Sequence, residues 1–156
     1  MTTENPTFSV SREINFCYGH RLLNYPGKCR HLHGHNGRLV ITLAASDLDQ
    51  RGMVLDFSEI KRLLSGWIDD HLDHRMILNR ADPAVPVLEG LGEPLYLMDV
   101  NPTAENIAKL IFEVAVQHGF PMLEVRLWET PGCCATYCPG VPSGAERRSP
   151  RPLGEG

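Results

Sequence analysis

Cys29-Arg30-His31-Leu32-His33-Gly34-His35-Asn36 is the most informative segment of this sequence, and the apolar-rich run 38–43 follows it almost directly. Two histidines spaced two residues apart lie on the same side of an extended strand. The apolar odd positions of 38–43 share this parity with His33 and His35. We therefore expect a strand over 33–46 that carries two imidazoles at the mouth of an apolar face, where they form a good partial metal site.

An alternating pattern also occurs earlier, over residues 7–20. Its apolar side chains occupy even positions, which is typical of a half-buried strand. His20 has the same parity at the end of the run, so it should face the interior too. Taken alone, His20 is better explained as a core histidine bonded to a backbone carbonyl. Beside His33 and His35 it becomes a candidate third metal ligand.

The composition is that of an ordinary globular protein. The 156 residues are 42% hydrophobic and 22% charged, which fits one domain with a sizeable core, placed here at 1–138. Residues 139–156 consist mainly of Pro, Gly, Ser and charged residues, so we expect a disordered tail there. The net charge of −4 argues against a general nucleic-acid partner.

The location expected from the sequence is the cytoplasm. The first residues lack a signal-peptide pattern, and no apolar run reaches membrane-spanning length. The cysteines number five and show no scaffold spacing, which favours free thiols in a reducing compartment. We therefore expect a protein without a membrane partner.

Helical periodicity marks two segments. Asp56 with Glu59 three residues later is typical of a capping box, and the apolar stripe that follows ends near 69–74. Thr103 is a plausible cap for a second helix, which ends at His118 before a glycine.

The rest of the chain predicts two more strands and one irregular region. The strands are expected over 122–130 and 134–137. The region 79–101 is rich in Pro and Gly, and two short apolar pieces, 85–88 and 95–100, would pair as a small hairpin. The element order predicts an α+β fold in which two helices cover one antiparallel sheet.

Three imidazoles without an obvious fourth protein ligand describe a catalytic zinc site with an open position. Such an ion polarises a substrate carbonyl or hydroxyl. A closed structural site is the alternative, with Cys29 as the fourth ligand, because thiolates bind zinc well.

Aspartate–histidine pairs form a second feature. Asp70-His71 and Asp73-His74 both fall near the end of the first helix, and periodicity does not choose between them. An aspartate bonded to a histidine fixes its tautomer and raises its basicity. The alternative is a solvated helix end, where histidines are common.

Carboxylates form a third feature. Glu129 shares the inward parity of the strand 122–130, so it needs a partner. A salt bridge is one explanation; a ligand with two adjacent N–H donors, such as a guanine or pterin ring, is the other. Glu105 is more easily explained by the dipole of the second helix. Positive charge for an anionic substrate is offered near the histidines by Arg21, Lys28, Arg30 and His31.

Taken together, these segments resemble the 6-pyruvoyltetrahydropterin synthase and 6-carboxytetrahydropterin synthase family. The resemblance covers residues 8–137. The matching segments, in the order of the family, are Phe16-Cys17-Tyr18-Gly19-His20-Arg21-Leu22, Cys29 with His33-Gly34-His35-Asn36, Asp56-Phe57, Leu72-Asp73-His74, Asn101-Pro102-Thr103 with Glu105, and Glu129-Thr130.

The resemblance implies a tunnelling fold (T-fold), which is a four-stranded antiparallel sheet with two helices on one face. Three subunits of the family close a barrel, and two trimers stack into a homohexamer whose active sites lie at subunit interfaces. The residues that match the zinc ligands of the family are His20, His33 and His35.

The resemblance also assigns roles around the metal. Cys29 matches the catalytic cysteine, and Asp73 with His74 matches an Asp–His pair that reaches this cysteine from a neighbouring subunit. Glu129 matches the carboxylate that anchors the pterin. The same pocket is lined in the family by residues that match Thr103 and Glu105.

Three residues separate Cys29 from His33, as in bacterial 6-carboxytetrahydropterin synthases. The implied reaction is conversion of 7,8-dihydroneopterin triphosphate to 6-carboxy-5,6,7,8-tetrahydropterin, acetaldehyde and triphosphate, an early step toward queuosine. The sister reaction, elimination of triphosphate to 6-pyruvoyltetrahydropterin, is the first alternative. A structural zinc-binding protein is the second.

Three departures from the family pattern stand out. Gly37 replaces the aromatic residue that usually follows the His-Gly-His-Asn segment, which should loosen a wall of the pocket. The region 79–101 is longer than the minimal pattern and should add contacts at a subunit interface. The spacing after His74 is one residue longer than expected.

Overall fold

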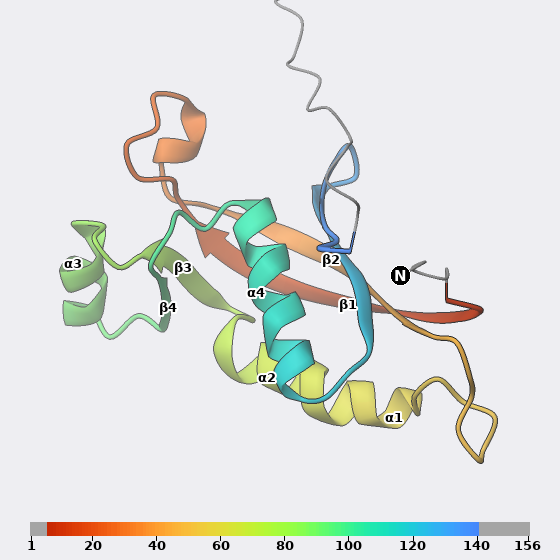
Figure 1. Cartoon of the computed structure of the whole chain (residues 1–156). Helices are drawn as coiled ribbons and strands as arrows, with labels where there is room; N and C mark the ends of the chain where they lie inside the picture. Colours follow the sequence, from red (N-terminus) through yellow and green to blue (C-terminus); the bar gives the residue numbers. More distant parts are fainter. Residues whose placement is uncertain (1–5, 141–156) are drawn as a thin grey trace, which may run out of the picture.

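The computed structural model describes residues 6–140, so most of the predicted tail 139–156 lies outside the described residues. Two long strands form the centre of the molecule (Figure 1). β1 (Phe8–His20) and β2 (His33–Ala45) pair antiparallel along their whole lengths, from Phe8 opposite Ala45 to His20 opposite His33. The predicted first two strands are confirmed.

The sheet has six strands in the order β4-β3-β1-β2-β5-β6. β5 (Met122–Thr130) and β6 (Cys133–Tyr137) continue the antiparallel part, as predicted. The expectation of only four strands was wrong. β3 (Arg75–Asn79) pairs parallel with the end of β1, and β4 (Leu95–Met98) pairs parallel with β3.

The hairpin proposed within 79–101 was also wrong. Its first half lies in the short helix α3 (Ala84–Gly90), while its second half contributes β4. Pro86 falls in the first turn of α3, where a proline costs no intrahelical hydrogen bond.

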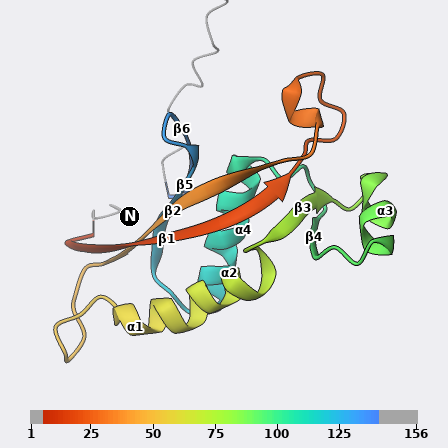
Figure 2. The ribbon, with the colours of Figure 1, turned by 180° about the vertical axis from the view of Figure 1, so that it is seen from behind.

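Two helices cover one face of the sheet, as Figures 1 and 2 show from opposite sides. The first is continuous through α1 (Phe57–Glu59), a π-helical stretch (Ile60–Ser65) and α2 (Gly66–His71). The second is α4 (Ala104–Gln117), capped by Thr103 as predicted. Asp56 caps the first helix by accepting from the backbone N–H of Ser58, not from that of Glu59 as a capping box requires.

The hydrophobic core lies between these helices and the sheet. It follows the predicted parities, with even positions from β1 and odd positions from β2 and β5. Its central members are Ile14, Phe16, Leu39, Ile41, Leu43, Ile60, Leu64, Ile68, Ile107, Ile111, Val125 and Leu127. At the end of β1 and the start of β2, histidines replace the apolar side chains on this face. A search of the described helices finds none with the length and apolarity needed to cross a membrane.

Candidate metal centre and substrate pocket

The strand register places the three histidines side by side. His20 lies opposite His33 in the β1–β2 ladder, and His35 follows two residues further along β2. One ligand atom from each ring lies within 4.8 Å of the others. The Nε2 atoms of His20 and His35 are 3.1 Å apart. The sequence prediction that these imidazoles share one face is confirmed.

Backbone carbonyl oxygens lie within hydrogen-bond distance of Nδ1 in two of the three rings. The Nδ1 atom of His20 lies 2.7 Å from the carbonyl oxygen of Pro102, and Nδ1 of His33 lies 2.7 Å from that of His31. An Nδ1–H that donates to a carbonyl leaves Nε2 unprotonated and turned toward the cluster. This arrangement is typical of the outer contacts of metal-binding histidines.

The residues fit a zinc ion. Burial lowers the pKa of His20, against the opposing effects of the Pro102 carbonyl and Glu129, so the ring is neutral at neutral pH. Neutral imidazoles are the form that binds metal. Two nitrogens bound tetrahedrally to zinc are about 3.3 Å apart, close to the separation of the facing Nε2 atoms. Among the residues that the structure describes, this cluster contains the histidines and not Cys29.

Glu129 lies beside two of the three imidazoles. Its Oε1 atom is 3.7 Å from Nε2 of His20, and its Oε2 atom is 3.9 Å from Nε2 of His35. The phenol of Tyr18 donates to Oε1 at 3.4 Å. No lysine or arginine within residues 6–140 pairs with this carboxylate, which disfavours the simple salt bridge considered from the sequence.

A strand irregularity positions this carboxylate. The β5–β6 register shifts between Trp128 and Thr130, so Glu129 lies at a bulge at the end of β5. Bulges bend a strand and redirect a side chain, and they are frequent beside active sites. The parity of β5 was readable from the sequence, but this bulge was not.

Asp73 and His74 form a hydrogen-bonded pair. Nδ1 of His74 lies 2.8 Å from Oδ2 of Asp73, while Oδ1 accepts from the backbone N–H of Cys17 at 2.9 Å. Burial raises the pKa of Asp73, but the bonds from Cys17 and His74 outweigh it and leave the pKa below its usual value. His74 has a φ of +56° and its side chain is 79% exposed.

The other Asp–His pair is not built in this way. His71 directs Nδ1 to the carbonyl oxygen of Trp67 at 2.9 Å and stacks its ring on that indole. The geometry therefore distinguishes Asp73-His74 from Asp70-His71, which the sequence pattern left open.

Cys29 lies in a 3₁₀ turn, Lys28–Arg30, within the connection from β1 to β2. Its carbonyl accepts from the N–H of Leu22 at 2.8 Å, which holds the turn against the end of β1, and the residue is half-buried. No hydrogen bond in the described part of the chain joins its thiol to the Asp73–His74 pair.

Thr103 and Glu105 follow the carbonyl of Pro102 that holds His20. The hydroxyl of Thr103 accepts from the N–H of Asn106 at 3.1 Å and so acts as the helix cap. Glu105 is exposed in the first turn of α4. Both residues directly follow the segment that holds His20, and no hydrogen bond in the described part of the chain joins either of them to Glu129.

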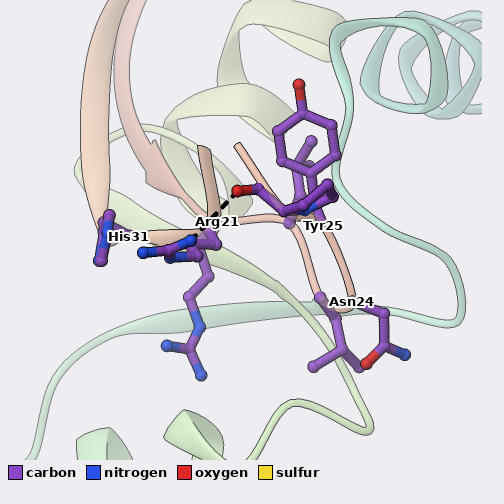
Figure 3. Close-up of a pocket in the computed structure, with 8 residues that line it drawn as sticks. Arg21, Asn24, Tyr25 and His31 are labelled. Atoms are coloured by element: carbon purple, nitrogen blue, oxygen red, sulfur yellow. Dashed lines mark hydrogen bonds between the residues drawn. The ribbon is translucent and has the colours of Figure 1, made fainter. Parts of the chain in front are cut away.

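A pocket of about 590 Å³ opens beside the turn that carries Cys29, and Arg21, Asn24, Tyr25 and His31 lie around it (Figure 3). One of the positive charges expected there is already paired with a carboxylate. Arg21 forms a two-bond ion pair with the buried carboxylate of Asp82. Arg30 donates to the carbonyl oxygen of Pro26.

Sequence reasoning missed the residues that hold this loop. The amide of Asn101 donates to the carbonyl oxygen of Leu23 at 2.8 Å and accepts from its N–H at 3.1 Å. Together with the Arg21–Asp82 pair, these bonds fasten the chain after β1 to the region 79–101. No pattern local to Asp82 or Asn101 reveals contacts that span about 60 to 80 residues.

We expect Asp82→Asn to destabilise the protein by about 2–3 kcal/mol at pH 7, because Arg21 loses its charged partner. The Arg21 hydrogen bond holds the pKa of Asp82 below its usual value, so this stabilisation is present above the unfolded-state pKa near 4 and disappears as the pH falls through the lower folded-state value. Urea unfolding at pH 7 and pH 3 tests both statements.

The control for this substitution is Asp99→Asn, which removes an exposed pair with Arg80. It should change the free energy of unfolding by less than about 0.5 kcal/mol. An Asp82→Asn effect equal to that of the control at pH 7, or one that persists undiminished at pH 3, would contradict the assignment.

Comparisons with known proteins agree with this geometry. The family model described as 6-pyruvoyl tetrahydropterin synthase matches residues 9–139. A Rickettsia bellii protein named 6-carboxy-5,6,7,8-tetrahydropterin synthase is 38% identical over 130 residues, which cover 79% of this chain and 94% of that protein. The family match therefore includes every element that carries the histidines.

Solved structures with this fold also match. The crystal structure of an uncharacterized protein from Wolinella succinogenes has a TM-score of 0.72 and 29% identity, covering 84% of this chain and 97% of that one. The 6-pyruvoyl tetrahydropterin synthase of Caenorhabditis elegans has a TM-score of 0.63 and 26% identity, covering 84% and 94%.

Proposed function

The chain belongs to the 6-pyruvoyl tetrahydropterin synthase family, and from this premise we propose that it is a zinc-dependent 6-carboxytetrahydropterin synthase. The proposed reaction is a carbon–carbon lyase step that converts 7,8-dihydroneopterin triphosphate and one water molecule to 6-carboxy-5,6,7,8-tetrahydropterin, acetaldehyde and triphosphate, toward queuosine. The name of the Rickettsia bellii relative and the three-residue spacing from Cys29 to His33 support this product.

One observation carries the proposal: Glu129 lies within 3.9 Å of two of the three clustered imidazoles. A carboxylate accepts two adjacent N–H donors at once, as on the amide and amino edge of a pterin ring. A pterin held there would have its side chain close to the histidines. Thr103 and Glu105 are proposed to line the same pocket.

The proposed roles of the other residues follow from their chemistry. His20, His33 and His35 hold the zinc, which when bound supplies a Lewis acid for the oxygen atoms of the substrate side chain. Cys29 moves protons on that side chain as a thiolate. Asp73 fixes the tautomer of His74, and the pair tunes the thiolate and relays its proton.

A homohexamer built from two trimers is proposed as the working form. The exposed side chain of His74, which forms no hydrogen bond to Cys29 within residues 6–140, supports a site completed by a neighbour. Within residues 6–140, β3 pairs with β1 only at Tyr18, Gly19 and His20, so the edge of β1 from Phe8 to Phe16 is open to a strand of another subunit. Light scattering that gives the mass of a single chain would contradict this.

The domain and location are proposed as the sequence predicts them. We place one synthase domain at 1–138, a tail at 139–156, and the protein in the cytoplasm without a nucleic-acid or membrane partner. The family match over 9–139 supports the extent of the domain.

The test is incubation of the zinc-loaded protein with 7,8-dihydroneopterin triphosphate, followed by assay of acetaldehyde and of the pterin product. We expect acetaldehyde and 6-carboxytetrahydropterin in equal amounts. A 6-pyruvoyl product without acetaldehyde would assign the sister reaction instead. Absence of any turnover by folded, zinc-loaded protein would contradict both.

A further inference from the structure

We propose that Tyr18 is a positioning residue of the pterin pocket, whose ring fills the space left by Gly37 and whose hydroxyl orients the Glu129 carboxylate. The inference rests on the proposed function, since it takes Glu129 to be the group that holds the pterin. It goes further by assigning to Tyr18 the role of fixing the orientation of that carboxylate.

The steric part of the inference concerns Gly37. A Cβ atom added there would lie 2.9 Å from Cε1 of Tyr18, 3.3 Å from the carbonyl oxygen of Phe16 and 3.4 Å from Cδ1 of Leu127. Real Cβ atoms are not found this close to a ring carbon that has no room to move. The Tyr18 ring therefore lies across the neighbouring strand over Gly37. We expected the pocket wall at Gly37 to be loose. The ring of Tyr18, which comes from β1, closes it instead.

The ring itself has little freedom. Tyr18 is 1% exposed, and its ring stacks on Phe16 with centroids 5.2 Å apart. It meets the edge of His20 at 5.3 Å and lies 5.8 Å from His35. A ring packed on three sides by aromatic groups holds its hydroxyl at a fixed place.

The hydroxyl reaches the carboxylate that faces the metal centre. It donates to Oε1 of Glu129, the same oxygen that lies 3.7 Å from Nε2 of His20. A phenol is protonated at neutral pH, so the hydroxyl of Tyr18 is the donor and the carboxylate the acceptor in this bond. A carboxylate has about four acceptor sites, so Glu129 accepts this bond and still has room for two N–H donors of a ligand.

The first test is Tyr18→Phe, which keeps the ring and removes the donor. We expect the Kd for 7,8-dihydroneopterin, measured by calorimetry on zinc-loaded protein, and the KM for its triphosphate to rise about tenfold. The kcat should change less than about twofold, because the interaction holds the ground state and the transition state equally. Zinc content and Tm should not change. Tyr137→Phe, which removes a hydroxyl from β6 where the ring packs on Phe112, is the matched control.

The second test transfers the aromatic ring from β1 to β2. Tyr18→Ala should lower the Tm by on the order of 10 °C, because it empties the space over Gly37. Adding Gly37→Phe should restore most of that loss, since the new ring enters the same space from β2. The double variant should still bind dihydroneopterin as weakly as Tyr18→Phe, because it has no hydroxyl.

Three results would overturn the inference while leaving the proposed function intact. These are wild-type pterin affinity in Tyr18→Phe, loss of zinc from that variant, or no recovery of Tm on adding Gly37→Phe. Wild-type protein that neither binds dihydroneopterin nor turns over its triphosphate would overturn the proposed function, and this inference with it.

Discussion

His33→Ala should abolish both zinc binding and turnover. The cluster then keeps only two imidazoles, and the zinc content after dialysis should fall from about one ion per chain to less than about a tenth. Loss of a Lewis acid worth several kcal/mol should lower kcat/KM on the order of 10³-fold or more. Metal analysis together with the acetaldehyde assay measures both effects.

The control is His71→Ala, which removes an imidazole that stacks on Trp67 at the end of α2. It should retain zinc and turnover. Because His33 is only half-buried, its truncation leaves no cavity in the core, and circular dichroism should show an unchanged fold. A folded His33→Ala protein that still binds one zinc ion would exclude the proposed metal site.

Cys29→Ala should separate metal binding from catalysis. Its thiol lies outside the imidazole cluster, so the zinc content and the Tm should stay at wild-type values. Removal of a group that transfers protons in the reaction should lower kcat by about 10²–10⁴-fold. The measurements are metal analysis, thermal unfolding and acetaldehyde release on the same preparation.

An exposed thiol of β6 provides the matched control, since Cys133→Ala should leave all three quantities unchanged. The competing explanation makes the opposite prediction for Cys29→Ala. If the thiol is the fourth ligand of a structural zinc, the variant should lose the ion and unfold at a lower temperature. That result would contradict the proposed enzyme. It would support a binding protein whose fold is stabilised by zinc.

Much of this site follows from strand parity alone. His20, His33, His35 and Glu129 were placed on one face because side chains alternate along a strand, and the structure confirms that placement. The sequence does not reveal the strand irregularity that positions Glu129 on this face. The bulge at the end of β5 depends on pairing with β6, which a single-strand pattern does not contain.

The incorrect or missing predictions also have causes that lie outside the local sequence. β3 is a five-residue strand whose partner lies more than 50 residues earlier, so no local alternation reveals it. The apolar run 85–88 was assigned to a hairpin because it is short and apolar, yet Val87 is 63% exposed on a helix. His74 takes a left-handed backbone conformation that few non-glycine residues adopt, and sequence patterns do not predict it.

The uninterrupted pairing of β1 with β2 has a consequence for which ion the proposed metal site would bind. Backbone pairing places His20 opposite His33, so the strand register itself brings the imidazoles together. Folding therefore contributes little to the choice between metal ions. Affinity for such nitrogen donors follows the Irving–Williams order, in which Cu²⁺ exceeds Zn²⁺. If the proposed metal site is correct, the identity of its ion should therefore depend strongly on the supply of free ions in the cell. Protein produced in copper-rich medium should be purified with copper in place of zinc.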